Sequence, residues 1–286
     1  MSTAENSRLD ECLNEGAGVY FMTTQKIASV QSPYQLIEVF DTPELGRLMR
    51  IDGGNMLSER DEFFYHENFI HPAAISHSAL QSALIIGGGD GGSAEELLKH
   101  PSVKVVTLCE LDQVVIDVAK AHFQSVHHDI FSHPKIDLRI GDGAQYVEST
   151  ADLFDLVYLD LTDPAGLAEA LYTQKFYRDC KRVLNEGGAL TLHIGSPFSH
   201  PARVKSSIEN LRSVFNIVTP YFVHIPTYGA TWGFAVGSDH LHPAGIGAAE
   251  IDLRLNQRAI GDRQFYNGET HRAMLALPEY IRNLIA

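Results

Sequence analysis

The stretch that decides the fold is Leu84-Ile85-Ile86-Gly87-Gly88-Gly89-Asp90-Gly91-Gly92. Three apolar residues that favour strands run into a turn crowded with glycines, and residues 93–99 continue with helical character. Such a strand–turn–helix unit lets a ligand approach the backbone and the helix N-terminus, because glycine carries no side chain. The glycines also satisfy the G-x-G-x-x-G spacing, which alone is weak evidence. The unit predicts a ligand site where this strand ends.

Asp90 is the informative residue of this turn. A turn that holds a pyrophosphate presents backbone N–H groups and the positive end of a helix dipole, so a carboxylate there would repel the phosphates. A carboxylate suits a cationic ligand instead, although aspartate is also common in solvated turns. The turn therefore favours a cation over a dinucleotide.

The composition is that of a soluble globular protein. The chain has 286 residues, of which 44% are hydrophobic and 20% charged, and this length allows one large domain or two smaller ones. The first residues lack a basic-then-apolar signal, and no apolar run is long enough to span a membrane. We therefore expect a cytoplasmic protein without a membrane partner.

The net charge and the spacing of potential metal ligands argue against nucleic-acid-binding and metal-binding functions. The formal net charge of −14 argues against nucleic acid as a partner and is compatible with a small cation. The three cysteines, at positions 12, 109 and 180, show no C-x-x-C spacing. His127-His128-Asp129 lacks the i, i+4 spacing of a zinc site. We expect no metal site and no prosthetic group.

Two patterns divide the chain near residue 78. Residues 1–78 contain short runs rich in β-branched and aromatic residues, at 19–22, 26–30, 34–40, 45–51 and 56–57, followed by aromatic residues at helical spacing in 60–70. From residue 79 to 286 strands and helices alternate, which is typical of a parallel sheet covered on both faces. The expected strands are 84–86, 103–109, 136–140, 154–159 and 189–193, with a final antiparallel pair at 217–225 and 231–237. The predicted fold is thus α/β, a small antiparallel β-domain followed by a Rossmann-like, doubly wound sheet.

Four consecutive strands of this sheet are followed by acidic residues: Asp90, Glu110, Asp142 and Asp160. Ligands of doubly wound sheets bind at the carboxyl ends of the strands, so these groups belong to one edge. Glu110 follows Asp90 by twenty residues, where a carboxylate accepts the hydroxyls of a ribose. Asp142 is placed to accept an adenine amino group, beside the amide of Gly143. We infer an adenosine pocket without a pyrophosphate clamp.

Asp160 and Asp163 form a second informative pair. Their i, i+3 spacing over a turn closed by Pro164 can aim two carboxylates into one cavity, where they would raise one another's pKa unless a cation bound between them. An Asx-turn or a helix cap is the structural alternative, mainly for Asp163. A polyamine suits such a site, with Tyr65 and Tyr228 as aromatic walls and Trp232 behind one of them.

At this point the chain resembles the polyamine aminopropyltransferases, the spermidine synthase family. The motifs that carry the resemblance span nearly the whole chain and stand in family order: 31–35 (QSPYQ), 61–67 (DEFFYHE), 87–92 (GGGDGG), Glu110, 142–144 (DGA), 160–164 (DLTDP), 171–173 (LYT), 176–177 (FY), 225–228 (IPTY), 265–267 (FYN) and 276–278 (ALP). The resemblance implies decarboxylated S-adenosylmethionine as co-substrate, a polyamine acceptor and methylthioadenosine as by-product. It also implies a homodimer or homotetramer.

The resemblance also implies a role for each matching residue. The donor is bound by Gln35, Asp90, Glu110, Asp142 and Gly143, with Asp142 and Gly143 at the adenine. Asp160, the first acid of the D-x-x-D-P motif, is the catalytic proton acceptor. The acceptor amine is bound by Tyr65, His66, Asp160, Asp163 and Tyr228, and His66 together with Asp90 holds the aminopropyl ammonium or the product amine.

Two departures leave the acceptor open. Where many bacterial spermidine synthases have Gln and Glu, this chain reads His193-Ile194-Gly195, and Gly229-Ala230-Thr231 replaces the usual Pro-Ser-Gly after Tyr228. Both stretches are similar to thermospermine synthases, which extend spermidine, whereas the glycine-rich turn follows the spermidine synthase form. The acceptor is therefore putrescine or a longer amine.

Three other functions compete with this interpretation. An S-adenosylmethionine-dependent methyltransferase would need room for the methionine carboxylate near Asp90, which opposes it. A catalytically silent polyamine-binding protein would not need Asp160 and Asp163 beside intact donor motifs. A nicotinamide dehydrogenase conflicts with the acidic turn.

Overall fold

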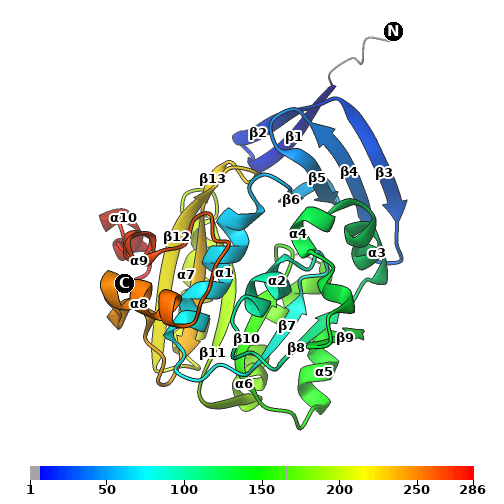
Figure 1. Ribbon diagram of the computed structural model, residues 1–286. Helices are drawn as coiled ribbons and strands as arrows, with labels where there is room; N and C mark the ends of the chain where they lie inside the picture. Colours follow the sequence, from blue (N-terminus) through cyan, green and yellow to red (C-terminus); the bar gives the residue numbers. More distant parts are fainter. Residues whose placement is uncertain (1–6, 165) are drawn as a thin grey trace.

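The N-terminal part of the chain forms two small antiparallel sheets. The structure, a computed structural model, describes residues 7–164 and 166–286. Strands β1 and β2 pair as a hairpin, and β3 to β6 form a four-stranded sheet in sequence order (Figure 1). Their bounds are β1 Ser7–Asn14, β2 Ala17–Thr23, β3 Gln25–Gln31, β4 Leu36–Thr42, β5 Gly46–Ile51 and β6 Gly54–Ser58. The sequence predicted every one of these strands except β1, whose residues are mostly polar; one face of β1 is exposed, and the other, with Leu9, Glu11 and Leu13, is half-buried.

The rest of the chain is built on a seven-stranded sheet of order β12-β13-β11-β10-β7-β8-β9. The strands from β11 to β9 pair in parallel, and β13 and β12 are added antiparallel at one edge. Their bounds are β7 Ser82–Gly87, β8 Val105–Glu110, β9 Ile136–Ile140, β10 Phe154–Asp160, β11 Leu184–Gly195, β12 Ile217–Ile225 and β13 Ala230–Ser238. The predicted α/β fold is confirmed, including the final antiparallel pair.

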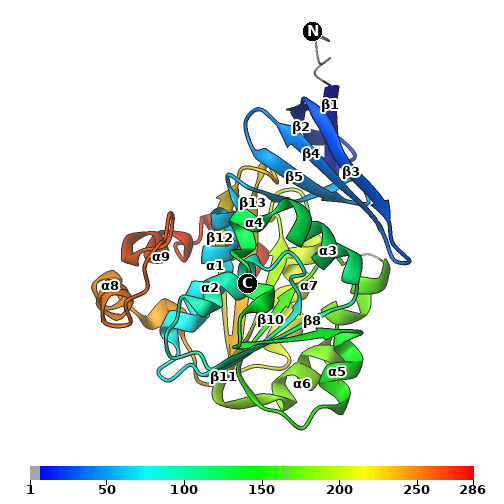
Figure 2. The ribbon, with the colours of Figure 1, turned by 45° about the vertical axis from the view of Figure 1, so that its right-hand side comes forward.

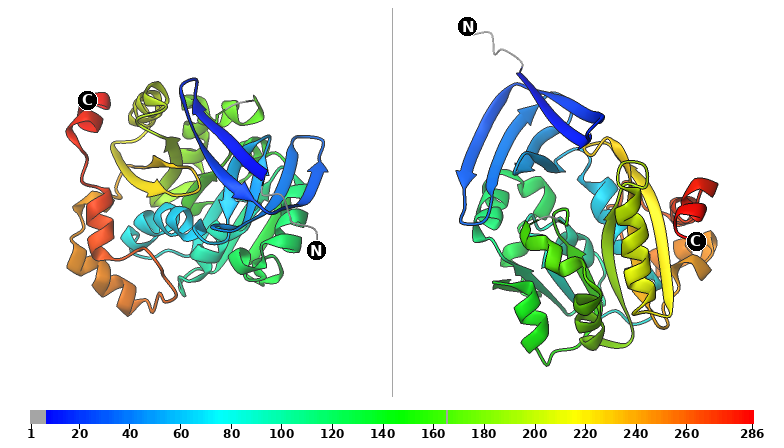
Figure 3. Two further views of the ribbon diagram at one scale, coloured as in Figure 1. Left: turned by 90° about the horizontal axis from the view of Figure 1, so that it is seen from above. Right: turned by 180° about the vertical axis from the view of Figure 1, so that it is seen from behind.

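Helices cover both faces of the large sheet because its buried strands are apolar on both sides. On one face, α1, α2 and α8 pack against alternate strand residues such as Ile85 and Tyr158 (Figure 1). On the other face, α5, α6, α7 and α10 pack against the intervening residues, among them Ile86 and Val157 (Figure 3). The helices span α1 Glu62–Ser76, α2 Gly92–Leu98, α5 Gly143–Ser149, α6 Gln174–Arg182, α7 Pro201–Arg212, α8 Ala248–Gln257, α9 Gly268–Met274 and α10 Glu279–Leu284, with 3₁₀ turns η1 Ile130–Ser132, η2 Gly166–Tyr172 and η3 Pro243–Gly245.

The small sheet sits over the carboxyl ends of the central strands (Figure 2). Its apolar face, which includes Ile37, Val39 and Met49, packs against the helices α3 (Gln113–His122) and α4 (Gln124–His127) through Val115 and Phe123. This contact fixes the height of the small sheet above the large one and leaves room between them for a ligand. The division of the chain at residue 78 stays a prediction; helix α1, which precedes it, packs on the large sheet.

The three helices after residue 245 were not predicted, and one buried carboxylate anchors the segment that joins them. Glu67 on α1 accepts hydrogen bonds from the backbone N–H groups of Gln264 (2.5 Å), Phe265 (2.9 Å) and Tyr266 (2.6 Å). Three charge-assisted bonds compensate the cost of burying that carboxylate. In the described part of the chain, every helix is too short or too polar to cross a membrane.

Candidate active site

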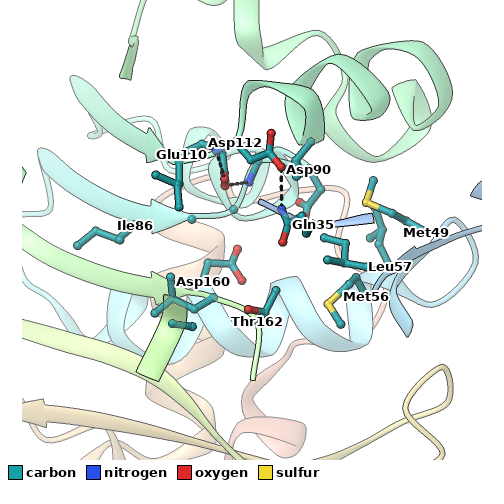
Figure 4. A pocket seen from close by; sticks show the side chains of 18 of the residues that line it. Gln35, Met49, Met56, Leu57, Ile86, Asp90, Glu110, Asp112, Asp160 and Thr162 are labelled. Atoms are coloured by element: carbon teal, nitrogen blue, oxygen red, sulfur yellow. Dashed lines mark hydrogen bonds between the residues drawn. The ribbon is translucent and has the colours of Figure 1, made fainter. Parts of the chain in front are cut away.

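A cavity of about 400 Å³ lies between the carboxyl ends of the large sheet and the small sheet. Its floor carries all four acids that the sequence placed at strand ends, because β10, β7, β8 and β9 are direct neighbours. Figure 4 shows Asp90, Glu110 and Asp160 around one space, with Met49 and Met56 of the small sheet opposite. The cavity thus combines an acidic floor with an apolar roof.

The glycine-rich turn is shaped by contacts that leave no room for side chains. Gly87 has φ +81° and Gly88 has φ +68°, and the Gly88 N–H donates to the backbone oxygen of Asp160 at 2.9 Å. A Cβ on Gly87 would collide with that same oxygen, and a Cβ on Gly92 would collide with the His66 ring. The glycines therefore hold Asp90 and the start of α2 directly beside Asp160.

Glu110 ends β8 as a buried carboxylate. It accepts hydrogen bonds from the backbone N–H groups of Gly89 (3.1 Å) and Asp112 (2.9 Å), which fix both of its oxygens (Figure 4). Burial raises the pKa of Glu110 to about 7, with contributions from Asp112 and Asp90. The group therefore changes charge near neutral pH.

The small sheet contributes Gln35 to this cavity. Its Nε2 donates to Asp112 at 3.1 Å (Figure 4). Asp112 also accepts from the Ser32 hydroxyl at 2.6 Å. Asp112 caps helix α3 as well, by accepting from Val114 N at 3.0 Å. One buried aspartate thus joins the small sheet, the helix and the cavity wall.

Asp142 and Gly143 line the far end of the cavity, beyond β9. Asp142 is the N-cap of α5 and accepts from Ala144 N at 2.8 Å through Oδ1. Gly143 lies directly against the Ile86 side chain, where any Cβ would collide with it. The Asp142 carboxylate and the Gly143 backbone thus lie together beside Ile86 at this end of the cavity.

Asp90 is paired with a buried histidine. Nδ1 of His66 lies 2.8 Å from Glu62, its Nε2 lies 3.5 Å from Asp90, and the His66 side chain is only 2% exposed. Burial alone would lower the pKa of His66, but the hydrogen bonds to Asp90 and Glu62 raise it well above its usual value. The imidazolium in turn lowers the pKa of Asp90 against the effect of burial. The cluster therefore places two carboxylates around one buried imidazole, and all three side chains line the cavity.

Asp160 is held by two hydroxyl groups. Tyr65 donates to its Oδ1 at 2.9 Å, and Ser93 donates to its Oδ2 at 2.6 Å. Burial raises the pKa of Asp160 to about 6, and the charge of Asp90 adds to this effect. A carboxylate with such a pKa is a base near neutral pH, and its orientation is fixed from both sides.

A smaller cavity of about 110 Å³ adjoins the first one, and the structure places Asp163 there. The expectation that Asp160 and Asp163 aim into one cavity therefore needs correction. Asp163 turns toward Arg203, whose Nη1 lies 2.8 Å from its Oδ1, because the ion pair draws the carboxylate away from Asp160. Tyr65 and Tyr228 line both cavities and form the passage between them.

The aromatic walls lie where the sequence predicted them. The rings of Tyr65 and Tyr228 are 6.1 Å apart, and Trp232 backs Tyr228 at 4.9 Å. The Tyr228 hydroxyl donates to the backbone oxygen of Met56 at 3.1 Å. Asp61 fastens the same loop by accepting from the N–H of Thr227 at 2.6 Å. The passage is therefore braced by the start of helix α1 and by β6.

Sequence reasoning missed several residues of the site: Glu11, Glu62, Ser93, Asp112 and Arg203. The Glu62 position, four residues before His66 on a predicted helix, was the one local signal that could have revealed an ion pair. Ser93 and Asp112 closely follow predicted site residues but bond to partners far along the chain, and Glu11 and Arg203 come from distant segments. Among the described residues, three or more metal-ligating side chains do not cluster anywhere.

Fold and site together define a class of protein. A doubly wound sheet with carboxylates at the ends of adjacent strands, and with an acidic glycine-rich turn in place of a phosphate loop, belongs to a nucleoside-binding transferase with the methyltransferase-like fold.

Comparisons with known proteins identify the family within this class. Residues 62–244 match the family model described as "Spermine/spermidine synthase domain". A polyamine aminopropyltransferase from Nitrosomonas europaea is 45% identical over 276 residues, covering 96% of this chain and 85% of that protein. Polyamine aminopropyltransferase 1 from Pseudomonas aeruginosa is 35% identical over 280 residues, 98% of each chain.

Solved structures of the same family are similar to this chain over nearly its whole length. The crystal structure of a spermidine synthase in complex with the transition state analogue AdoDATO is similar at a TM-score of 0.92 and 32% identity, covering 98% of this chain and 95% of that one. The spermidine synthase from Thermotoga maritima is similar at a TM-score of 0.90 and 31% identity, with coverages of 98% and 94%. The chain belongs to the spermine/spermidine synthase family of polyamine aminopropyltransferases.

Proposed function

We propose that this protein transfers the aminopropyl group of decarboxylated S-adenosylmethionine to putrescine, which gives spermidine and releases methylthioadenosine. The observation that carries the proposal is that Asp90, Glu110 and Asp160 share one cavity, where Asp160 is hydrogen-bonded to Tyr65 and Ser93. Such a site offers a nucleoside pocket, an ammonium partner and a base within one enclosure.

The donor fits the cavity by charge and shape. We assign its ribose hydroxyls to Glu110 and Gln35, and its adenine to Asp142 and the Gly143 amide above Ile86. The donor's ammonium lies at Asp90, whose imidazolium partner leaves one negative charge for one cation. His66 is 2% exposed, so in this assignment it acts behind Asp90 rather than on the amine itself.

The acceptor amine enters through the passage between Tyr65 and Tyr228. An ammonium cannot attack, so the amine first gives one proton to the carboxylate of Asp160. Its lone pair then attacks the methylene carbon next to the sulfonium: the N–C bond forms, the C–S bond breaks, and the sulfur takes the electron pair as a neutral thioether. Holding both reactants in one enclosure removes up to about 7–11 kcal/mol of the barrier.

The same chemistry on spermidine is the alternative acceptor assignment. The smaller cavity beyond Tyr65 and Tyr228 supports it, because Glu11 and Asp163 line that cavity and add acidic groups for a longer amine. An S-adenosylmethionine-dependent methyltransferase is less well supported, since the methionine carboxylate would lie against Asp90.

The deciding experiment uses purified protein with decarboxylated S-adenosylmethionine and a panel of putrescine, cadaverine, agmatine and spermidine. Mass spectrometry of the products should show a spermidine-forming transfer together with one equivalent of methylthioadenosine. Calorimetry with intact and decarboxylated donor separates the methyltransferase alternative, because our proposal requires tighter binding of the decarboxylated form. Absence of transfer to every amine would reject the proposal.

We also propose that the chain assembles as a homodimer or homotetramer in the cytoplasm, and that residues 1–78 form its separate β-rich domain. The exposed Tyr20 and Met22 on strand β2 support assembly, since they present apolar area on a small hairpin. Light scattering after size-exclusion chromatography measures the subunit number, and cell fractionation measures the location. Limited proteolysis of the full chain tests the division, which requires a preferred cut near residue 78.

A further inference from the structure

Arg203 occupies the space that a side chain at position 195 would fill. Gly195 ends strand β11 with φ +86°, and a Cβ on it would lie 3.1 Å from Nε of Arg203. A larger residue at 195 would therefore have to displace the guanidinium. The two positions form one unit: a glycine without a side chain and an arginine that comes from helix α7 to take its place.

The guanidinium is fixed in this position by four neighbours. Nη1 lies 2.8 Å from Asp163, and Nη2 donates to Nδ1 of His193 at 3.1 Å. The rings of Tyr172 and Trp232 each lie 5.7 Å from its central carbon. With only 13% of the side chain exposed, Arg203 is a built-in cation rather than a mobile surface charge.

His193 is suited to hold this cation because it remains neutral. Burial lowers its pKa to about 4, and the charge of Arg203 adds to the effect. Its Nε2 lies 2.8 Å from the backbone oxygen of Leu161, which fixes the proton on that nitrogen and leaves Nδ1 as the acceptor for Arg203. The histidine thus adds no positive charge of its own.

The charges around the smaller cavity can now be counted. Three carboxylates, Glu11, Asp160 and Asp163, lie at it or at the passage into it, and His193 and His200 line it as well. Of these carboxylates, Asp163 is already paired with Arg203, whereas burial raises the pKa of Glu11 to about 7, so that Glu11 is charged only in part near neutral pH. We propose that Arg203 is a specificity-determining residue that stands in for a third ammonium group, so that the acceptor site accepts a diamine and discriminates against a triamine.

This inference rests on the proposed function and names the acceptor for the same site. A diamine brings two positive charges to Glu11 and Asp160, the two carboxylates that Arg203 does not pair with, and its attacking nitrogen gives one proton to Asp160. A triamine would place an additional ammonium in the part of the cavity where Asp163 is already paired with a guanidinium. Like charges in a partly buried site repel each other strongly, so the longer amine is disfavoured although the cavity has room beyond Tyr228.

The test measures the ratio of kcat/KM for spermidine to kcat/KM for putrescine. Arg203→Gln removes the charge and should raise this ratio about tenfold, whereas Arg203→Lys keeps the charge and should leave the ratio within about twofold of the wild-type value. Circular dichroism establishes that both variants fold. A ratio that does not change in Arg203→Gln, or that changes equally in Arg203→Lys, overturns the inference, as does a wild-type enzyme that prefers spermidine.

A second variant keeps the test valid even if the Arg203 variants do not fold. The Asp163 side chain is 51% exposed, so Asp163→Asn is compatible with folding. It leaves the guanidinium uncompensated, and the ratio should therefore fall several-fold below the wild-type value; an unchanged ratio would contradict the inference. If the wild-type protein releases no methylthioadenosine with any amine, the proposed function fails instead, and the two failures are distinguishable.

Discussion

Replacing Asp160 with asparagine should separate its cost to the fold from its value to catalysis. Asparagine has the same shape, and the hydroxyls of Tyr65 and Ser93, now 2.9 and 2.6 Å from the carboxylate, can still bond to the amide. The variant cannot take a proton from the attacking amine. Loss of a positioned base costs about 10²–10⁴ in rate, and we expect kcat to fall by that factor while the KM for the donor changes little.

The same change should stabilise the ligand-free protein at alkaline pH. Burial and Asp90 raise the pKa of Asp160 from 3.8 to about 6, so the folded state binds more protons than the unfolded state between these values. Stability contributed by the protonated group is therefore present below pH 3.8 and is lost as the pH rises through about 6. The charged group costs about 3 kcal/mol at pH 8, and Asp160→Asn removes much of that cost.

Two measurements on one preparation check both effects. Steady-state release of methylthioadenosine gives kcat, and urea unfolding at pH 4 and pH 8 gives the stability difference. Asp155→Asn is a matched control on the same strand: Asp155 accepts from Gln81 N and Ser82 N, far from the cavity, so its loss should lower stability and spare the catalytic constants. Near-normal turnover of Asp160→Asn would refute the assignment of the base. If the variant and the wild type differ in their free energy of unfolding by the same amount at pH 4 and at pH 8, the electrostatic argument is refuted.

Three further substitutions test the donor side. The pKa of Glu110, raised by burial to about 7, predicts that the donor KM rises as the pH falls through 7, and Glu110→Gln should give a KM about tenfold higher that no longer depends on pH. His66→Gln leaves Glu62 and Asp90 without their cation, so urea unfolding at pH 7 should show a free energy of unfolding that is about 3–5 kcal/mol lower. A decrease of less than about 1 kcal/mol would mean that His66 is not charged. Gly92→Ala places a methyl group in the His66 ring, and we expect a loss of about 1–3 kcal/mol with weaker donor binding in calorimetry, whereas unchanged binding would show that the turn can shift.

The sheet could be predicted because its information is local. The apolar runs at residues 82–86 and 154–159 have the length and composition of buried parallel strands, and the glycine-rich turn marks where one of them ends. Strand β1 could not be predicted in this way, because its half-buried face reads Leu9, Glu11 and Leu13, and the acid in the middle interrupts the apolar alternation. The helices from residue 248 onward are short, and what fixes the segment between them is a distant carboxylate, Glu67.

The site was predictable only as far as topology places residues. The ends of neighbouring parallel strands meet at one edge, and this rule alone brought Asp90, Glu110 and Asp160 together. Which partner holds each carboxylate depends on helix packing, and no sequence spacing relates Ser93 to Asp160 or Arg203 to Asp163. The direction of Asp163 was therefore wrong in the prediction although its position in the motif was right.

The raised pKa values of two buried carboxylates indicate that they serve ligand binding rather than stability. A fold that only needed stability would not place Glu110 and Asp160 where burial raises their pKa to about 7 and about 6. The cost is compensated when a sulfonium and an ammonium enter, because the cations restore the charge balance that the buried acids lack. His66 and Arg203 already supply part of that balance, one beside Asp90 and one beside Asp163. Under the acceptor assignment proposed above, the number of carboxylates left without a cationic partner, rather than the size of the cavity, decides between a diamine and a triamine.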